Sequence, residues 1–82
     1  MSKIEKALFR LLNRPKDFTW KELILIMSHF DYEEVKGSGS RRKFVNFNKS
    51  VAISLHEPHP KRILKRYAID LVTNHLKEEG LL

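Results

Sequence analysis

Histidines and arginines share one strongly basic stretch of this chain, and these residue types together can bind phosphate and move protons. Residues 36–66 contain nine Lys and Arg and one acid, Glu57, which leaves a net charge of +8. Histidine suits proton transfer because its unperturbed pKa is close to neutrality. The planar guanidinium of arginine can bind two phosphate oxygens at once. The stretch therefore predicts a surface that meets nucleic acid; the alternative is a basic face that only keeps the protein soluble.

Composition limits the class of protein. The chain has 82 residues, a formal net charge of +6 and no cysteine. This length suits one small domain, and the lack of cysteine excludes disulfides and thiolate metal sites. No apolar run approaches the roughly twenty residues that span a bilayer, and the charged N-terminus does not resemble a signal peptide. We expect a soluble, cytoplasmic protein in which residues 1–82 form a single domain.

Two capping boxes mark the starts of helices in the first third of the chain. Ser2 with Glu5, and Thr19 with Glu22, each place an acid three residues after a hydroxyl, which is the pattern of a capped helix start. The proline at position 15 stops the first helix, so we expect helices within residues 2–14 and from residue 19 to about residue 30. The apolar residues at helical spacing are Ile4, Leu8, Leu11 and Leu12 in the first helix and Leu23, Ile24, Met27 and Phe30 in the second.

The middle of the chain changes to the alternating pattern of strands. Residues 32–36 predict a short strand, and the Gly-Ser run at 37–40 predicts a turn. Alternating apolar and polar residues then predict strands over 42–47 and 51–56. The residues between them, 48–50, form a plausible three-residue hairpin loop.

The register of this hairpin decides which side chains share a face. Only a register that puts both apolar sets on one face buries them, so we expect Phe47 to lie opposite Val51. Arg42, His56 and Phe44 would then share the open face, where Phe44 stacks on a base or contacts a protein partner. The expected core-facing pairs are Val45–Ile53 and Lys43–Leu55, and the expected open-face pairs are Asn46–Ala52, Phe44–Ser54 and Arg42–His56.

The last helix is expected to start at Pro60, which suits a first helical position, and to end at Gly80. Cations in the first turns of a helix cost about a few tenths of a kcal/mol each, which suggests that they have a function there; the alternative is a solvated basic face. His59 is either the N-cap of this helix or a second proton-transfer group. The order of helix, helix, three antiparallel strands and helix predicts an α+β fold with helices on one face of a small sheet. The cations concerned are Lys61, Arg62, Lys65 and Arg66.

Residues 19–82 resemble the HicA family of toxins from bacterial type II toxin–antitoxin systems. The resemblance rests on the helix opening WKELILIMSHF at 20–30, the Gly39-Ser40 turn before a strand, His59-Pro60 before the last helix, and the helix end at 79–81. It implies a three-stranded αβββα fold like that of the double-stranded RNA-binding domain, to which residues 2–14 add an extra helix. It also implies a ribonuclease that cleaves mRNA without a metal or other cofactor and is neutralised by a HicB-like antitoxin.

The chain departs from the family pattern where the family carries its catalytic histidine. Arg41 follows Gly39-Ser40, so the sequence looks more like a variant branch with the pattern GSGSR…HxPHP. We predict that His56 takes the catalytic role from the neighbouring strand, with His59 as the second candidate. The H-x-x-H spacing has no third ligand nearby and does not predict a metal site. The residues predicted to bind RNA are Ser40, Arg41, Arg42, Lys43, Phe44, Lys61, Arg62 and Lys65.

Other interpretations stay open at this point. The missing family histidine favours a nucleic-acid-binding module without chemistry, and a DNA-binding adaptor that uses the last helix is a third option. His56 is then a polar surface residue. His29 and His75 are expected to be packing or surface residues. The leucines of the first helix belong either to the core or to an interface with a second copy or an antitoxin.

Overall fold

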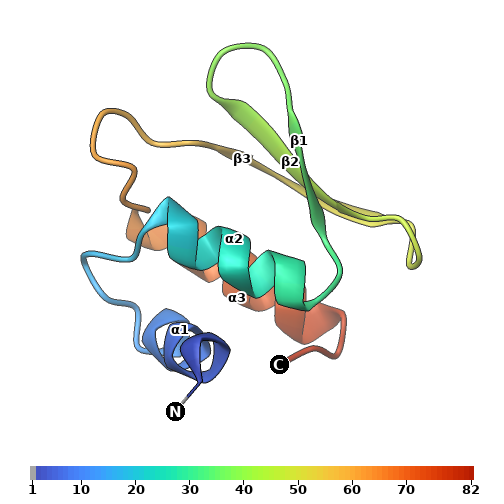
Figure 1. The fold of residues 1–82 in the computed structure, drawn as a ribbon, viewed down its shortest axis with the longest axis horizontal. Coiled ribbons are helices and arrows are strands. Elements are labelled where there is room, and N and C mark those ends of the chain that lie inside the picture. The colour runs from blue at the N-terminus through green and yellow to red at the C-terminus, as the bar shows by residue number, and fades with distance from the viewer. Residues whose placement is uncertain (1) are drawn as a thin grey trace.

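The computed structural model describes residues 2–82 and confirms the predicted α+β fold (Figure 1). Three antiparallel strands form one sheet in the order β1-β2-β3, and the helix–sheet–helix order agrees with the double-stranded RNA-binding domain type. The elements are α1 (Lys3–Leu12), α2 (Trp20–His29), β1 (Glu33–Lys36), β2 (Arg41–Asn46), β3 (Val51–His56) and α3 (Arg66–Glu78).

The elements form three layers. Helices α2 and α3 cover one face of the sheet, with α2 against β1 and α3 against β3. Helix α1 packs on α2 and α3 from the side away from the sheet (Figure 1). Within residues 2–82 no helix covers the other face of the sheet, as the sequence predicted. Among residues 2–82 no helix combines the length and the apolar character needed to cross a bilayer.

Both predicted capping boxes are present. The hydroxyls of Ser2 and Thr19 accept from the backbone N–H groups of Glu5 and Glu22, at 3.2 Å each. The two glutamate side chains accept in return from the N-cap residues. These bonds satisfy donors that the first turn of a helix leaves free, which explains why both helices begin where the sequence predicted.

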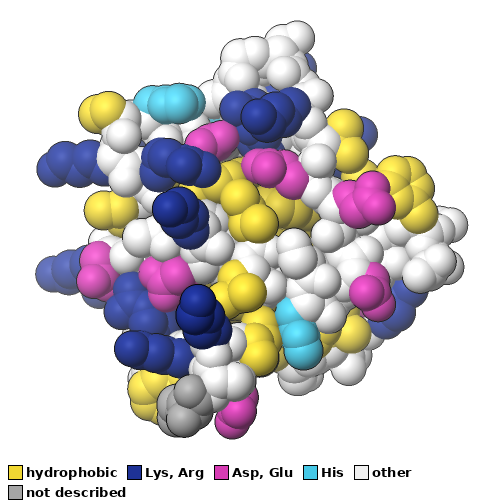
Figure 2. All heavy atoms as spheres, viewed as in Figure 1, with side chains coloured by type: hydrophobic (Ala, Val, Ile, Leu, Met, Phe, Trp, Pro, Cys, Tyr) yellow, Lys and Arg dark blue, Asp and Glu magenta, His cyan; other side chains and the backbone are white. Residues whose placement is uncertain are grey.

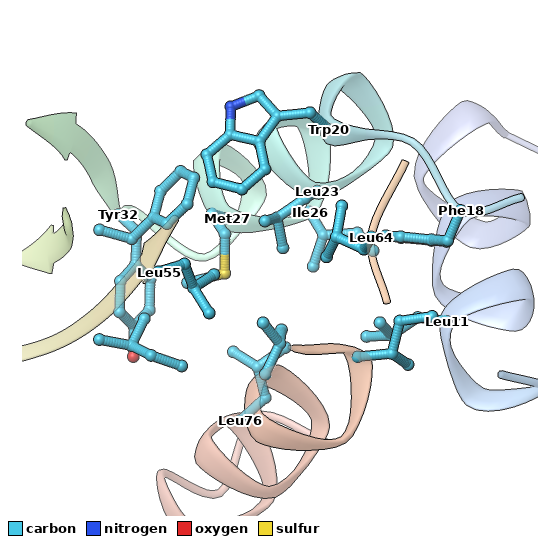
Figure 3. Close-up of a cluster of buried hydrophobic side chains, with 14 of the residues drawn as sticks. Leu11, Phe18, Trp20, Leu23, Ile26, Met27, Tyr32, Leu55, Leu64 and Leu76 are labelled. Carbon is cyan, nitrogen blue, oxygen red and sulfur yellow. The ribbon is translucent and has the colours of Figure 1, made fainter. Parts of the chain in front are cut away.

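The core lies between the sheet and the helices (Figure 3). Side chains from all layers point toward one centre there, with Leu11 from α1, Trp20 from α2, Leu55 from β3 and Leu76 from α3. Of the leucines of α1, Leu11 is therefore a core residue. Leu8 packs partly against the core, and Leu12 is 52% exposed.

The predicted register of the β2–β3 hairpin was wrong by one residue. The loop holds four residues, 47–50, and Asn46 rather than Phe47 pairs with Val51. Buried Asn46 donates to the carbonyl of Phe30 at 3.2 Å and accepts from the N–H of Lys49 at 3.1 Å. These bonds hold Asn46 inside and start the loop one residue early, because a buried amide needs partners. Every side chain of β2 therefore faces opposite to the prediction.

The last helix starts six residues later than predicted, at Arg66, with Lys65 as its N-cap. The preceding segment is extended because it pairs with the start of α2. Leu64 N–H donates to Phe18 C=O at 2.8 Å, and Trp20 N–H donates to Arg62 C=O at 2.9 Å. Burial of Leu64 in the core favours this pairing over another helical turn.

The later start of α3 changes the place of the residues before it. Lys61 and Arg62 lie in the loop before α3 rather than in its first turn, and His59 is not its N-cap.

The C-terminal end of α3 agrees with the prediction. Gly80, just after the helix, has φ 73°. The N–H of Leu81 donates to Leu76 C=O at 2.9 Å. This bond belongs to a glycine-terminated helix end of the kind predicted from Gly80.

Candidate nucleic-acid interface

The uncovered face of the sheet brings Arg41 and His56 together. They are directly opposite each other at one end of the β2–β3 pair, and Lys43 faces Ser54 one row further along. All four side chains are exposed. Cross-strand neighbours on one face have Cβ atoms about 4.5–5.5 Å apart. An imidazole and two cations thus share a small, open area.

The turn before β2 is tied to the end of β3. Ser40 Oγ lies 3.2 Å from His56 Nδ1, and the N–H of Glu57 donates to Ser40 C=O at 2.8 Å. Within the turn, the N–H of Gly37 donates to Arg41 C=O at 2.9 Å. These bonds fix the position of Ser40 beside the His56 ring, so the two residues form one unit on this face.

Arg42 does not lie on the open face, and its predicted pairing with His56 was wrong. The structure pairs it with Leu55, and its side chain is only 12% exposed. Its Nε lies 3.1 Å from Glu57 Oε1, and one terminal nitrogen donates to Gly39 C=O at 2.9 Å. Because the register differs by one residue, Arg41 takes the place predicted for Arg42. Arg42 instead lies on the opposite face and stabilises the turn through its bond to Gly39 C=O.

Glu57 is the centre of a structural ion-pair cluster that the prediction of site residues missed. Its second carboxylate oxygen lies 2.7 Å from Arg62 Nε, so it joins Arg62 to Arg42. Glu34 extends the cluster, since it accepts from Trp20 Nε1 at 3.0 Å and lies 3.9 Å from Arg42 Nε. The signal was present in the sequence, because Glu57 is the lone acid among residues 36–66.

Phe44 is also not on the open face, so the prediction that it stacks on a base or contacts a protein partner there was wrong. Its side chain is 1% exposed. Its ring packs on Trp20, with centroids 5.5 Å apart. Because Asn46 is buried and side chains alternate along a strand, Phe44, two residues earlier, also points into the core. An aromatic ring buries a large apolar area there.

Several cations of the basic stretch have no carboxylate partner within residues 2–82. Figure 2 shows Lys and Arg side chains along the side of the molecule where the loop after β3 lies, and further ones below them over α1. His59 is exposed in this loop, and no described hydrogen bond joins it to His56 or Ser40. The unpaired cations are Lys36, Arg41, Lys43, Lys49, Lys61, Lys65 and Arg66; of these, Lys49 donates to a backbone carbonyl, that of Glu79.

A hollow of about 550 Å³ opens on the sheet beside His56. Val35 of β1, which is 43% exposed, contributes an apolar surface to it. The hollow has no acidic side chain in its lining, which includes Lys36, Gly37, Ser38, Arg41, Lys43, Ser54 and His56. Such a volume falls in the range of small-ligand sites.

The other two histidines lie elsewhere. His29 is exposed at the end of α2. His75 is partly buried, and its Nε2 lies 2.7 Å from the hydroxyl of Tyr32. Burial, with a smaller contribution from the charge of Glu79, raises the pKa of the Tyr32 phenol. Within residues 2–82 no three His, Cys, Asp or Glu side chains are grouped so that they could hold a metal ion.

The sequence of the sheet and its two covering helices matches a known family. The model of a family described as HicA toxin of bacterial toxin–antitoxin matches residues 20–80. The match begins with α2 and ends beyond α3, so α1 lies outside it. No curated protein and no solved structure matches the chain.

Proposed function

The chain belongs to the HicA toxin family, and we propose that it is an endoribonuclease that cleaves mRNA by metal-independent acid–base chemistry centred on His56. As a family member it is the toxin of a toxin–antitoxin pair and has a cognate antitoxin. The observation that carries the proposal is the exposed His56 directly opposite Arg41, with its Nδ1 3.2 Å from Ser40 Oγ.

The contact with Ser40 suits His56 to act as a general base. When Nδ1–H donates to Ser40 Oγ, the other ring nitrogen, Nε2, carries the free lone pair and faces solvent. Nε2 then takes the proton of a ribose 2′-hydroxyl, and the resulting alkoxide attacks the adjacent phosphorus. The bond to the 5′-oxygen breaks, and that oxygen leaves with a proton. Ser40 acts as a positioning residue that holds the ring in place.

Arg41 and Lys43 supply positive charge where the reaction creates negative charge. The attacked phosphate gains charge on its equatorial oxygens in the transition state, and fixed cations stabilise it. Arg41 suits this role because its guanidinium can bind two oxygens at once and has no ion-pair partner within residues 2–82. Lys61 and Lys65, in the loop before α3, extend the positive surface along the RNA.

His59 is the candidate acid for the leaving oxygen. It is exposed and follows β3 by three residues, so RNA bound at His56 passes within reach of the loop that carries it. Its contribution is expected to be smaller than that of His56, since water can also protonate the leaving oxygen.

The test is cleavage of a labelled single-stranded mRNA in the presence of EDTA. We expect the wild type to cut the RNA. The cleavage rate of His56→Ala should be lower by about 10²–10⁴-fold, while its RNA affinity and folding stay unchanged. His29→Ala is the matched control, since it removes another exposed histidine and should cleave like the wild type. Equal cleavage by His56→Ala and wild type would transfer the chemistry to His59, and His59→Ala tests that outcome.

One observation favours a second candidate function, a nucleic-acid-binding module without chemistry. Arg41 stands where the resemblance places the family's catalytic histidine. In that case neither the wild type nor His56→Ala cuts RNA, whether the RNA is free or on translating ribosomes. Both proteins still bind RNA, with an affinity that falls steeply as the salt concentration rises.

A further inference from the structure

We infer that the hollow beside His56 is a subsite for one unstacked nucleobase of single-stranded RNA, next to the phosphate that is cut. The inference rests on the proposed function for the identity of that phosphate. The binding of a base stands on the geometry of the hollow itself, which involves Val35, Ser38 and Ser54. None of these three residues is needed for the chemistry at His56.

The open face of the sheet changes in character from row to row. Arg41 and His56 form the row at the turn, where the proposed function places the phosphate. The next row runs across three strands as Val35, Lys43 and Ser54. Rows on one face of a strand are two residues, about 6.7 Å, apart, which is the scale of one nucleotide between its phosphate and its base. A phosphate at the first row therefore places its base over the second.

The second row has the chemistry of a base site. Val35 is apolar and 43% exposed, and the methylene stem of Lys43 adds further apolar surface. The hydroxyl of Ser54 both donates and accepts, as the edge of a base requires. An apolar surface does not stabilise a bound phosphate. It does stabilise a bound base, because packing removes the apolar faces of the base from water.

The same features select single-stranded RNA. A base within a duplex is stacked and paired, so its faces and edge cannot reach a hollow on a protein surface. Sequence-specific RNA recognition accordingly uses unpaired, splayed bases. The cations of the lining and the absence of acidic side chains from it favour an anionic ligand, and the apolar surface beside them favours one that carries a base.

Gly37 keeps the rim of the hollow open. A Cβ at this position would lie 3.2 Å from Arg41 Cβ, which is closer than ordinary contact. The glycine lets the turn pass close to Arg41 while the arginine side chain stays over the sheet. Gly37→Ala is therefore expected to shift Arg41 and narrow the hollow.

The first experiment is NMR titration of the wild-type protein with short single-stranded RNAs that carry 2′-O-methylribose at every position, so that no 2′-hydroxyl is free to attack the phosphate and no cleavage can occur. Four oligomers differ only in one central base. We expect the amides of Val35, Lys43 and Ser54 to shift, with affinities that differ about fivefold or more between bases. The same sequence as a duplex should leave these amides unshifted. Shifts that are absent from these residues, or equal for all four bases, would overturn the inference whether or not the protein cuts RNA.

The second experiment measures the affinity of two variants for the preferred oligomer. Val35→Ala removes apolar contact, and Ser54→Ala removes a hydrogen bond; each should weaken binding about fivefold and reduce the difference between bases. Leu71→Ala on α3 and Ser28→Ala on α2 are the matched controls, because Leu71 is 45% exposed and Ser28 is also exposed. Equal effects of the hollow and control variants would overturn the inference.

Cleavage separates this inference from the proposed function. If the wild type cuts RNA, Val35→Ala and Ser54→Ala should raise KM and flatten the preference for the nucleotide at the cut, while kcat stays near that of the wild type. If the wild type binds the base selectively but never cuts, the proposed chemistry fails and the base subsite stands. If a protein partner shifts the hollow residues and RNA does not, the hollow is a protein interface and the inference fails.

Discussion

Arg41 and Arg42 are neighbours in the sequence with opposite roles in the structure. Arg41 is exposed on the open face beside His56 and has no ion-pair partner among residues 2–82. Arg42 is 12% exposed, pairs with Glu57 and binds the Gly39 carbonyl. The positive charge of one is available to phosphate, while that of the other is neutralised inside the protein. Residue type and local charge density therefore do not identify a binding arginine; the face of the strand does.

The same division runs through the whole basic stretch. Arg62 belongs to the paired group, because Glu57 holds it at 2.7 Å, whereas Lys43 belongs to the unpaired group. A paired arginine stabilises the fold and positions its neighbours, and an unpaired one is available for a ligand. Each of the following changes tests that division.

The largest effect is expected when the paired group loses its acid. Glu57→Ala leaves the charge of Arg42 nearly buried with only a distant carboxylate at Glu34. Removing one partner of such a pair should cost about 3 kcal/mol and lower Tm by on the order of 10 °C. Thermal unfolding monitored by circular dichroism checks this. The control is Asp70→Ala, which removes an exposed partner of Arg14 and should cost less than about 1 kcal/mol. Equal losses in the two variants would contradict the division.

The two adjacent arginines should give crossed results. Arg41→Ala should lower kcat/KM for RNA cleavage on the order of 10², since it removes a donor to the developing charge, and should leave Tm within about 2 °C. Arg42→Ala should lower Tm as Glu57→Ala does. Measuring both quantities for both variants decides the matter. A loss of Tm in Arg41→Ala as large as in Arg42→Ala would show that the division is wrong.

A smaller effect is expected in the salt dependence of RNA binding. Lys43→Ala removes one unpaired cation from the open face, so the slope of log K against log salt should decrease in magnitude by about 0.7 for single-stranded RNA. Lys49→Ala is the control, because Lys49 lies in the loop at the opposite end of β2 from Arg41 and His56. Its slope should equal that of the wild type. Fluorescence anisotropy at several salt concentrations measures both.

The smallest effect concerns the ion pair between α1 and α2. Burial raises the pKa of Glu22, but hydrogen bonds from Arg10 and Thr19 outweigh it and hold that pKa below its usual value of 4.5. Because the folded-state pKa is the lower one, the pair stabilises the fold above about pH 4.5 and this stabilisation is lost as the pH falls through the folded-state value. Glu22 is partly exposed, so the gain is modest.

Urea unfolding between pH 3 and pH 7 measures this contribution. Glu22→Gln should give a flatter decline in stability at low pH than the wild type and the same RNA affinity at pH 7. An unchanged decline would mean that the Arg10–Glu22 contact at 2.6 Å is not linked to folding.

Local patterns were sufficient for most of the fold. The capping boxes at Ser2 and Thr19 set the helix starts because they act within one turn of backbone. Gly80 ended α3 as predicted because its conformation is a local property. Helical spacing and alternation indicated the order of the elements and the uncovered face of the sheet. The type, order and approximate bounds of these elements were thus readable from the chain alone, and so was its membership of a toxin family.

Long-range contacts decided the site. The hairpin register depends on the hydrogen bond from Asn46 to Phe30 C=O, sixteen residues away in the chain. That register determines that Arg41 rather than Arg42 faces His56. Phe18 and Leu64, far apart in the chain, pair and keep the segment before Arg66 extended. The side chains of a strand can alternate in two ways, which differ in which set faces the core and correspond to registers one residue apart. The sequence of β2 alone favours neither clearly. Only the burial of Asn46 and Phe44 by other parts of the chain distinguishes them, so the face that each arginine occupies is a property of the folded molecule.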